Sequence, residues 1–269
     1  MSAGDTDYWD FFAQDALRTG SVLYSRLAAG IGRDEELKAL ASKARPGQPH
    51  ANLILAAVHV LLLRGADHPL KRFYPSLGGA ASAEGEDPFP DFKAFVHRHH
   101  DEIAPLIATR VTNTNEIGRS ALLHPAFRTL GAETDAPLSL IEIGPSAGLN
   151  LIWDWYGVRY RRDGETVASV NPTASLVIDC ELRGPAVPPT GPIPRLGGRV
   201  GLELNPVDLT RQDDRDWLRA LIWPDQVSRL ERLDRAIALF AKQQPPILAG
   251  DALALLPEAL ASVPRDDAA

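Results

Sequence analysis

One short segment constrains the fold of this chain more than any other part of the sequence. The apolar run Pro137 to Gly144 ends at a glycine-containing turn, and a second, largely apolar stretch from Leu149 to Tyr156 follows that turn. A short apolar run bounded by such a turn is typical of a buried strand, and the second stretch is expected to be a helix. A strand, a glycine turn and a helix start together let a ligand approach the backbone and its unpaired N–H groups. The segment therefore predicts an α/β fold with a ligand site at the end of this strand.

The sequence changes character at this segment. Residues 1–135 carry apolar side chains at helical spacing, whereas short apolar runs recur later, at Arg199–Leu204 and Pro246–Ala249, each followed by a helical pattern. Strands that alternate with helices predict parallel βαβ units and hence a parallel sheet. We therefore expect a helical N-terminal region over 1–135 and a Rossmann-like parallel-sheet core over 136–269, with a hairpin and proline-rich insertion at 157–198.

Local signals predict the individual elements. Asp34 has the residue type of a helix N-cap, Asp163-Gly164 between alternating residues indicates a hairpin turn, and Ser175 to Leu182 has the pattern of a strand. Residues Pro75 to Pro90, rich in glycine and proline, are expected to form a loop. The expected helices are Tyr8–Leu17, Val22–Ile31, one from Asp34 through Ala41, Ala51–Arg64, Asp91–Thr109, Asn115–Leu130, Asp213–Trp223, Gln226–Lys242 and one after Gly250-Asp251.

Composition and charge exclude several classes of protein. The 269 residues are 45% apolar and 23% charged with a formal net charge of −7, which is ordinary globular composition without the basic surface that nucleic-acid phosphates require. The single cysteine, Cys180, excludes an internal disulfide. The longest apolar stretch, Leu53 to Leu63, is interrupted by His59 and is far shorter than the roughly 20 residues of a membrane span. Because the N-terminus also lacks a signal-peptide pattern, we expect a cytoplasmic protein with no nucleic-acid or membrane partner.

The glycine turn allows three interpretations. As the dinucleotide pattern G-x-G-x-x-G, it departs at Ser146 and Leu149, where the second and third glycines belong. As the nucleophile elbow G-x-S-x-G, Gly144-Pro-Ser146-Ala-Gly148 matches, and Ser146 would be the nucleophile of a hydrolase. All seven histidines precede Ser146, however, whereas the usual chain order of that fold places the histidine after the serine.

The third interpretation follows from a resemblance. Glu142-x-Gly144-x-Ser146-x-Gly148 resembles the first motif of the class I S-adenosylmethionine-dependent methyltransferases, with a serine in place of the middle glycine. Glu203 near the end of the second expected strand and Asp251 after the third resemble that family's acidic residues in order and type. The resemblance implies that S-adenosylmethionine is the cofactor, that Glu203 accepts hydrogen bonds from its ribose hydroxyls, and that Asp251 accepts one from its adenine amine.

The placement of these carboxylates supports the resemblance, and one spacing departs from it. Each is expected at the carboxyl end of a strand, the edge where open α/β sheets bind ligands, and an acidic pocket suits a cationic sulfonium. About 60 residues separate Glu142 from Glu203, however, where about 20 are usual. The insertion between Gly157 and Gly198 accounts for the excess.

Most of the chain also resembles an uncharacterised bacterial family, a domain of unknown function with a helical N-terminal half and a methyltransferase-like core. The segments that carry this resemblance are Ala56–His59 with Leu61–Leu63, Phe73–Leu77, Thr114–Ser120, the glycine turn, Leu204–Asp208 and Trp223–Gln226. The resemblance implies a fold and no particular reaction.

A polar segment between two apolar helices holds further candidates. Asn115, Glu116 and Arg119 are expected on one helical face, where they are candidates for orienting an acceptor substrate. The alternative is a helix start capped by Asn113 or Thr114, with an internal pair between Glu116 and Arg119. Upstream, the charged run from His97 to Glu102 has no zinc signature, so we expect a solvated helix face there and no metal site.

The strand count gives the last expectation. Three core strands follow residue 137, and the chain reaches Ala269 where a fourth would start. We therefore expect a truncated chain whose core is incomplete at its C-terminus, with the Leu138–Ile143 strand as an exposed edge open to self-association. The expected function is S-adenosylmethionine-dependent methyl transfer, by in-line displacement, to a small-molecule or other unidentified acceptor. The alternatives are a non-catalytic binding or regulatory module that keeps the cofactor fold, and a hydrolase that uses Ser146.

Overall fold

The computed structural model describes residues 3–80 and 85–268. Contacts divide the chain into two compact units, of which the first holds 1–114 with 210–231 and the second holds 115–209 with 232–269. The chain therefore leaves the first unit and later returns to it. The expected boundary at residue 135 lies between helix α7 (Ser120–Glu133) and the first strand, which begins at Leu138. The division into domains at this residue stays a prediction.

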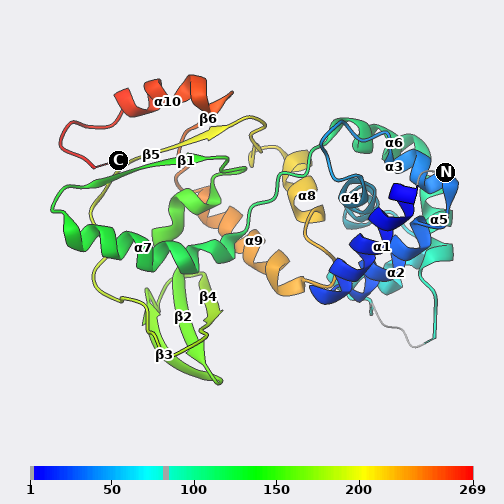
Figure 1. Cartoon of the computed structure of the whole chain (residues 1–269), viewed down its shortest axis with the longest axis horizontal. Coiled ribbons are helices and arrows are strands. Elements are labelled where there is room, and N and C mark those ends of the chain that lie inside the picture. Colours follow the sequence, from blue (N-terminus) through cyan, green and yellow to red (C-terminus); the bar gives the residue numbers. More distant parts are fainter. Residues whose placement is uncertain (1–2, 81–84, 269) are drawn as a thin grey trace. The chain divides into compact units, whose positions relative to one another are not determined.

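The first unit is helical, as the apolar spacing predicts (Figure 1). Its elements are α1 (Ala3–Arg18), α2 (Val22–Ile31), α3 (Glu35–Ala41), α4 (His50–Leu63), the 3-10 turns η1 (Pro69–Phe73) and η2 (Pro75–Leu77), α5 (Phe89–Arg98), α6 (His100–Thr109), α8 (Gln212–Ala220) and the start of α9 (Val227–Phe240). Helix α4 is buried on nearly every side and packs against α3, α6 and α8, so it forms the centre of this unit's core. None of the described helices is long and apolar enough to cross a membrane.

Ion pairs between residues far apart in the sequence hold α8 in the first unit. Arg64, directly after α4, pairs with Asp213 at 2.8 Å and with Asp216 at 2.9 Å. Arg110, directly after α6, pairs with Asp214 at 2.6 Å. These pairs join α4 to a helix about 150 residues later and α6 to the same helix about 100 residues later, which the local pattern of the sequence does not reveal.

His59, which interrupts the longest apolar stretch of the sequence, lies fully buried on α4. Its Nδ1 lies 3.1 Å from the carbonyl oxygen of Ala220, and its Nε2 lies 2.8 Å from the hydroxyl oxygen of Ser76. Because a carbonyl only accepts, Nδ1 donates and Nε2 accepts from Ser76. Burial lowers the pKa of His59 to about 4, so the ring is neutral at pH 7. Its two hydrogen bonds connect α4 to the end of α8 and to the turn η2.

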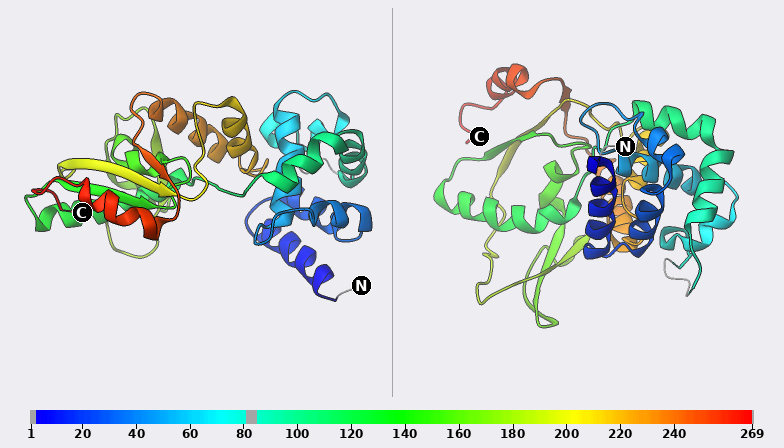
Figure 2. Two further views of the ribbon diagram at one scale, coloured as in Figure 1. Left: turned by 90° about the horizontal axis from the view of Figure 1, so that it is seen from above. Right: turned by 45° about the vertical axis from the view of Figure 1, so that its right-hand side comes forward.

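The second unit contains a parallel sheet of three strands, β1 (Leu138–Ile143), β5 (Leu196–Glu203) and β6 (Ile247–Ala249), in the order β1-β5-β6. The register pairs Ile143 with Leu202 and Glu203 with Ala249, so the three carboxyl ends lie at one edge. Helix α10 (Ala252–Ala261) lies along one face, on the opposite side from α7 (Ser120–Glu133) (Figure 2). The 3-10 helix η4 (Leu149–Trp155) lies on the same face as α7. The mixed α/β class and the small parallel sheet are therefore confirmed.

The insertion over residues 157–198 contains a second, small sheet. Its strands are β2 (Gly157–Arg162), β3 (Glu165–Val170) and β4 (Val177–Glu181), in the order β3-β2-β4. The predicted hairpin joins β2 to β3, and its turn residues Asp163 and Gly164 have φ values of 50° and 85°, the positive values that type I′ turns require. The predicted strand over Ser175 to Leu182 is present as β4, which runs parallel to β2.

Three helix predictions are corrected by the structure. The stretch Leu149–Tyr156 forms a 3-10 helix with a kink at Ile152 (φ −106°, ψ 28°). The pattern over Asp91–Thr109 breaks at His99 into α5 and α6. The helix expected from Asn115 begins at Ser120, after the 3-10 turn η3 (Ile117–Arg119), and it continues through Pro125. Part of the expected loop at 75–90 is the turn η2, and its residues 81–84 lie outside the described residues.

Among the residues that the structure describes, the outer edge of β1 is paired only at its start. Ala268 forms a parallel bridge with Leu138, in which the N–H of Ser139 donates to the carbonyl of Ala268 at 2.7 Å. The N–H of Ala268 donates in turn to the carbonyl of Pro137 at 2.8 Å. Beyond this bridge, no strand among the described residues pairs with that edge, as the sequence predicts.

Candidate functional site

The turn after β1 alternates residues in the left-handed region of backbone space. Gly144, Ser146 and Gly148 have φ values of 72°, 58° and 79°. A Cβ at Gly144 would meet no heavy atom within 4 Å, whereas one at Gly148 would lie 2.9 Å from Cδ1 of Ile247 on β6. Gly144 therefore leaves open space beside the backbone, and Gly148 lets the turn pack closely against the neighbouring strand.

Glu203, the last residue of β5, holds this turn from beneath. Its side chain is buried, and its two carboxylate oxygens accept hydrogen bonds from the N–H groups of Ser146, at 2.8 Å, and Asn205, at 2.9 Å. The N–H of Gly144 donates to the carbonyl of Leu202 at 2.9 Å. Each carboxylate oxygen retains further acceptor capacity, so Glu203 both braces the turn and keeps lone pairs for a ligand hydroxyl.

Asp251 lies at the same edge, directly after β6 and Gly250. The N–H of Gly250 donates to the carbonyl of Glu203 at 2.9 Å, which joins this segment to β5. The Asp251 carboxylate caps α10 by accepting from the N–H of Leu253 at 2.7 Å, and the residue is exposed. Asp251 therefore caps α10 through one carboxylate oxygen, and the cap does not use the other oxygen.

Exposed apolar side chains stand at the ends of all three strands. Ile143 ends β1 and is 63% exposed, Leu204 follows β5 and is 69% exposed, and Leu253 follows β6 in the first turn of α10 and is 86% exposed. Sequence reasoning missed these residues because it sought polar groups. The signal available was their position beside each candidate carboxylate, where exposed apolar surface indicates a binding face.

Glu142 precedes the turn on β1, where its carboxyl is largely buried. Burial is the main cause that raises its pKa; the charge of Arg119 lowers it and that of Glu203 raises it, and together they bring the pKa to about 7. The side chain lines a cavity of about 270 Å³ between β1, α7 and η4, whose other walls include Phe127 and Trp153. A carboxyl with a pKa near neutrality can take up or release a proton at physiological pH.

The three acceptor-side candidates do not share one helical face. Asn115 is buried in an extended segment, where its Oδ1 accepts from the N–H of Leu149 at 3.0 Å, so it fastens the far end of the glycine turn. Glu116 caps η3 by accepting from the N–H of Gly118 at 2.8 Å, and it faces Arg232 at 3.5 Å. The alternative, a helix start capped by Asn113 or Thr114, also differs from the structure, because Glu116 is the N-cap of η3 and Arg119 is the N-cap of α7, without a side-chain cap bond.

Ser146, the candidate nucleophile of the hydrolase interpretation, is 1% exposed. Its N–H donates to Glu203, and its carbonyl accepts from the N–H of Val207 at 3.2 Å. The backbone strain that a nucleophile elbow needs is present at this serine, but the exposure that lets an elbow hydroxyl meet a substrate is absent.

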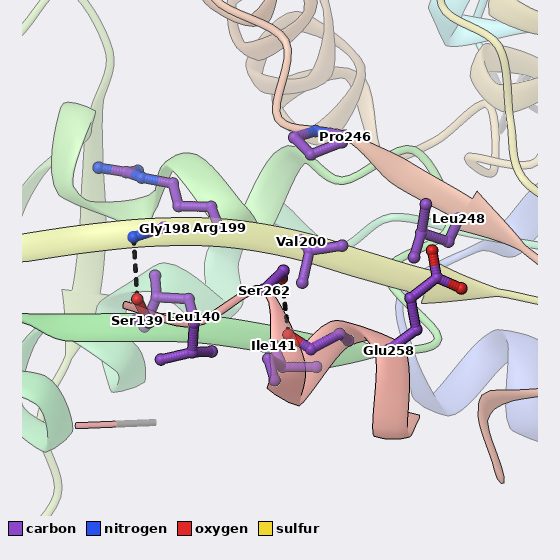
Figure 3. Close-up of a pocket in the computed structure, with 12 residues that line it drawn as sticks. Ser139, Leu140, Ile141, Gly198, Arg199, Val200, Pro246, Leu248, Glu258 and Ser262 are labelled. Carbon is purple, nitrogen blue, oxygen red and sulfur yellow. Dashed lines mark hydrogen bonds between the residues drawn. The ribbon is translucent and has the colours of Figure 1, made fainter. Parts of the chain in front are cut away.

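A second cavity of about 270 Å³ lies on the α10 face of the sheet (Figure 3). Apolar side chains of β1, β5 and β6 form its floor, and Glu258 and Ser262 of α10 lie at its wall. At one end, the hydroxyl of Ser139 accepts from the N–H of Gly198 at 2.9 Å and donates to Asp267 at 2.6 Å. Its polar end is thus satisfied by the chain itself, which fits a packing gap between helix and sheet.

The histidine run before α6 forms ordinary surface pairs. His97 lies 3.1 Å from Glu36 and His99 lies 2.7 Å from Glu102. Among the side chains that the structure describes, no group of three or more histidine, cysteine or acidic residues is arranged to hold a metal ion.

The fold and this edge define a mixed α/β protein whose parallel strands end at a glycine turn and a set of carboxylates. The chain belongs to the DUF2332 family, described as "Uncharacterized protein conserved in bacteria", whose model matches residues 7–269. The predicted resemblance to an uncharacterised bacterial family is thereby confirmed. Neither a curated protein nor a solved structure matches the chain.

Proposed function

We propose that the second unit binds S-adenosylmethionine and that the protein transfers its methyl group to a small-molecule acceptor not yet identified. One observation carries the proposal: the glycine turn, Glu203 and Asp251 meet at the carboxyl edge of the parallel sheet, joined by hydrogen bonds through Glu203. This is the edge at which open α/β sheets bind ligands. The class I methyltransferase type of the fold and the Rossmann-like order of the strands belong to the same proposal.

The residues present fit this cofactor in three respects. The open space at Gly144 admits a ligand against the backbone. The exposed side chains of Leu204 and Leu253 offer apolar surface for a flat ring. The carboxylate of Asp251, of which one oxygen accepts from Leu253, can accept a further hydrogen bond. The carboxylates of this edge suit a ligand with positive charge on a sulfonium and an ammonium group.

When bound, the cofactor supplies an electrophilic methyl group, and the chain supplies binding and orientation. Glu203 holds the turn in shape, and Asn115 fixes its far end, so the backbone that receives the ligand is already ordered. Glu142, with its pKa near 7, is the candidate for taking a proton from the acceptor. Arg119, whose charge acts on Glu142, remains a candidate for orienting the acceptor.

A non-catalytic binding module is the second candidate. The observation that favours it is that both oxygens of Glu203 already have backbone partners, so the residue serves the turn whether or not a ligand is present. The hydrolase interpretation is disfavoured by the burial of Ser146, and resistance of the folded protein to a fluorophosphonate probe is expected.

Calorimetry with S-adenosylhomocysteine on the full chain tests the proposal. Binding is expected for the wild type, and Leu253→Gln, at the proposed ring surface, is expected to weaken it by about tenfold. Leu260→Gln is the matched control, because Leu260 is an exposed leucine in the last turn of the same helix. Wild-type protein that is folded by circular dichroism and binds no S-adenosylhomocysteine would refute the proposal. If Leu253→Gln and Leu260→Gln weakened binding equally, Leu253 would not be part of a surface that binds the ring.

A further inference from the structure

Arg128 on α7 is a buried cation without a counterion. The residue is 7% exposed, and its Nε is inaccessible and has no hydrogen-bond partner. Nor does the guanidinium form an ion pair with any residue that the structure describes. Burial lowers the pKa of this side chain, and the nearby Tyr160 acts in the opposite direction. The group stays protonated all the same, because an arginine does not lose its charge in a protein.

An unpaired buried charge is costly, and folded proteins pair such groups. The same unit gives an example of a satisfied one: the guanidinium of Arg199 binds both carboxylate oxygens of Asp154, with Nη2 2.9 Å from Oδ2, and both side chains are largely buried. Arg128 is also buried, but no carboxylate among the described residues pairs with it as Asp154 pairs with Arg199. Arg128 is therefore available to pair with an anionic group from outside the chain.

Arg128 lines a cavity of about 430 Å³. It is bounded by the last turns of α7 on one side and by the proline-rich segment 189–195 on the other. The two walls are in direct contact, since a Cβ at Gly131 would clash with Pro194. The apolar lining consists of Ala132, Ala136, Pro189, Pro192, Ile193 and Pro194.

The other charges around the cavity limit the kind of anion. Asp135 also lines it, and the carbonyls at the end of α7 carry partial negative charge, so a polyanion would be repelled. Arg195 lines the rim but is exposed, and one of its N–H groups already donates to the carbonyl of Asp135 at 2.6 Å. The site thus offers one largely buried guanidinium and an apolar wall, which match a single carboxylate on an apolar body.

We propose that this cavity binds a small organic carboxylate, with its carboxylate on the guanidinium of Arg128 and its apolar part against the prolines of segment 189–195. The site is independent of the glycine turn and of the proposed methyl transfer. The buried fork supplies most of the binding, and the rim arginine contributes little because solvent screens it.

Titration of the full chain with benzoate, at constant ionic strength, tests the site by calorimetry. Saturable binding is expected, with benzamide, the neutral isostere, bound at least about tenfold more weakly. Arg128→Met is expected to abolish the difference between the two probes, and Arg195→Met, the matched control, to change benzoate affinity by less than about threefold. Without ligand, Arg128→Met is expected to melt at the wild-type temperature or above, because it removes an unpaired buried charge.

A measurement on the wild type covers the case in which Arg128→Met fails to fold. The shielded Nε–H of Arg128 gives its own ¹⁵N NMR signal, which benzoate is expected to shift and benzamide to leave in place. Absence of saturable benzoate binding, equal affinity for benzamide, an unmoved Nε–H signal, or tighter binding of inorganic phosphate than of benzoate would each overturn the proposal.

Discussion

The buried carboxylate of Glu203 accepts a hydrogen bond at 2.8 Å from the backbone N–H of Ser146, 57 residues earlier in the chain. Glu203 ends β5, and Ser146 lies in the turn that follows the adjacent parallel strand β1. This side chain therefore joins the turn to the neighbouring strand and helps to fix how the turn leaves the sheet.

Replacement of Glu203 by glutamine tests this role. The amide retains one acceptor and places a donor against the second N–H, so one buried N–H loses its partner and the unfolding free energy is expected to fall by about 1 to 3 kcal/mol. Chemical denaturation measures the change. Asp179→Asn is the control, because its ion pair with Arg159 is half exposed and is expected to cost less than about 1 kcal/mol. Equal losses in the two variants would contradict the bracing role.

The two glycines of the turn should respond differently to alanine. Both have positive φ, so each substitution is expected to cost about 1 kcal/mol from backbone strain. Gly148→Ala is expected to cost about 1 to 3 kcal/mol more, because its Cβ would lie 2.9 Å from Ile247. Gly144→Ala has free space and serves as the matched control. Thermal and denaturant unfolding of both variants measure the difference, and a larger loss at Gly144 would refute it.

The raised pKa of Glu142 predicts the direction of a pH effect on stability. The unfolded chain ionises this carboxyl near pH 4.5 and the folded protein near pH 7, so stability is expected to fall as pH rises between these values and to level off above. The loss amounts to about 3 kcal/mol at most. Glu142→Gln is expected to remove this component, so that the variant gains on the wild type between pH 5 and pH 8. Unfolding free energies measured across this range check the sign, and a constant difference would contradict it.

In the first unit, Ser76→Ala removes the hydroxyl that donates to Nε2 of the buried His59. The ring nitrogen then lacks a partner, and a loss of about 1 to 3 kcal/mol in unfolding free energy is expected. Ser42→Ala is the control, since its hydroxyl bonds the carbonyl of Ala39 at an exposed position and is expected to cost about 0.5 kcal/mol or less. A loss at Ser76 no greater than that at Ser42 would show that the histidine does not need this partner.

Features with local causes could be predicted from the sequence. Asp34 caps α3 as predicted, because a carboxylate three residues before an N–H needs nothing from elsewhere in the chain. The Asp163-Gly164 turn formed for the same reason, since positive φ is a property of those two residues. The strands β1, β5 and β6 form at the short apolar runs that the local sequence marks, although β6 is only partly covered and β5 is buried only at its end.

Features with distant causes could not be predicted. The partner of Glu203 lies 57 residues away, so the sequence indicates an acidic residue at a strand end but not the N–H groups it accepts from. The burial of Arg128 depends on a proline-rich segment about 60 residues later, and nothing near Arg128 signals it. The start of α7 was misplaced because Asn115 and Glu116 bond backbone N–H groups and so remain extended, which competes with helix formation.

The return of α8 to the first unit has a consequence for the order of events during synthesis. Helix α4 meets α8 through Arg64 and through the bond from His59 to the carbonyl of Ala220. About 110 residues are translated between the end of α6 and that carbonyl, which takes roughly 5 to 20 seconds on a ribosome. For that interval the nascent helices carry an uncovered apolar face and an unsatisfied histidine, so this is the period in which the emerging chain is most exposed to chaperones and to misassembly.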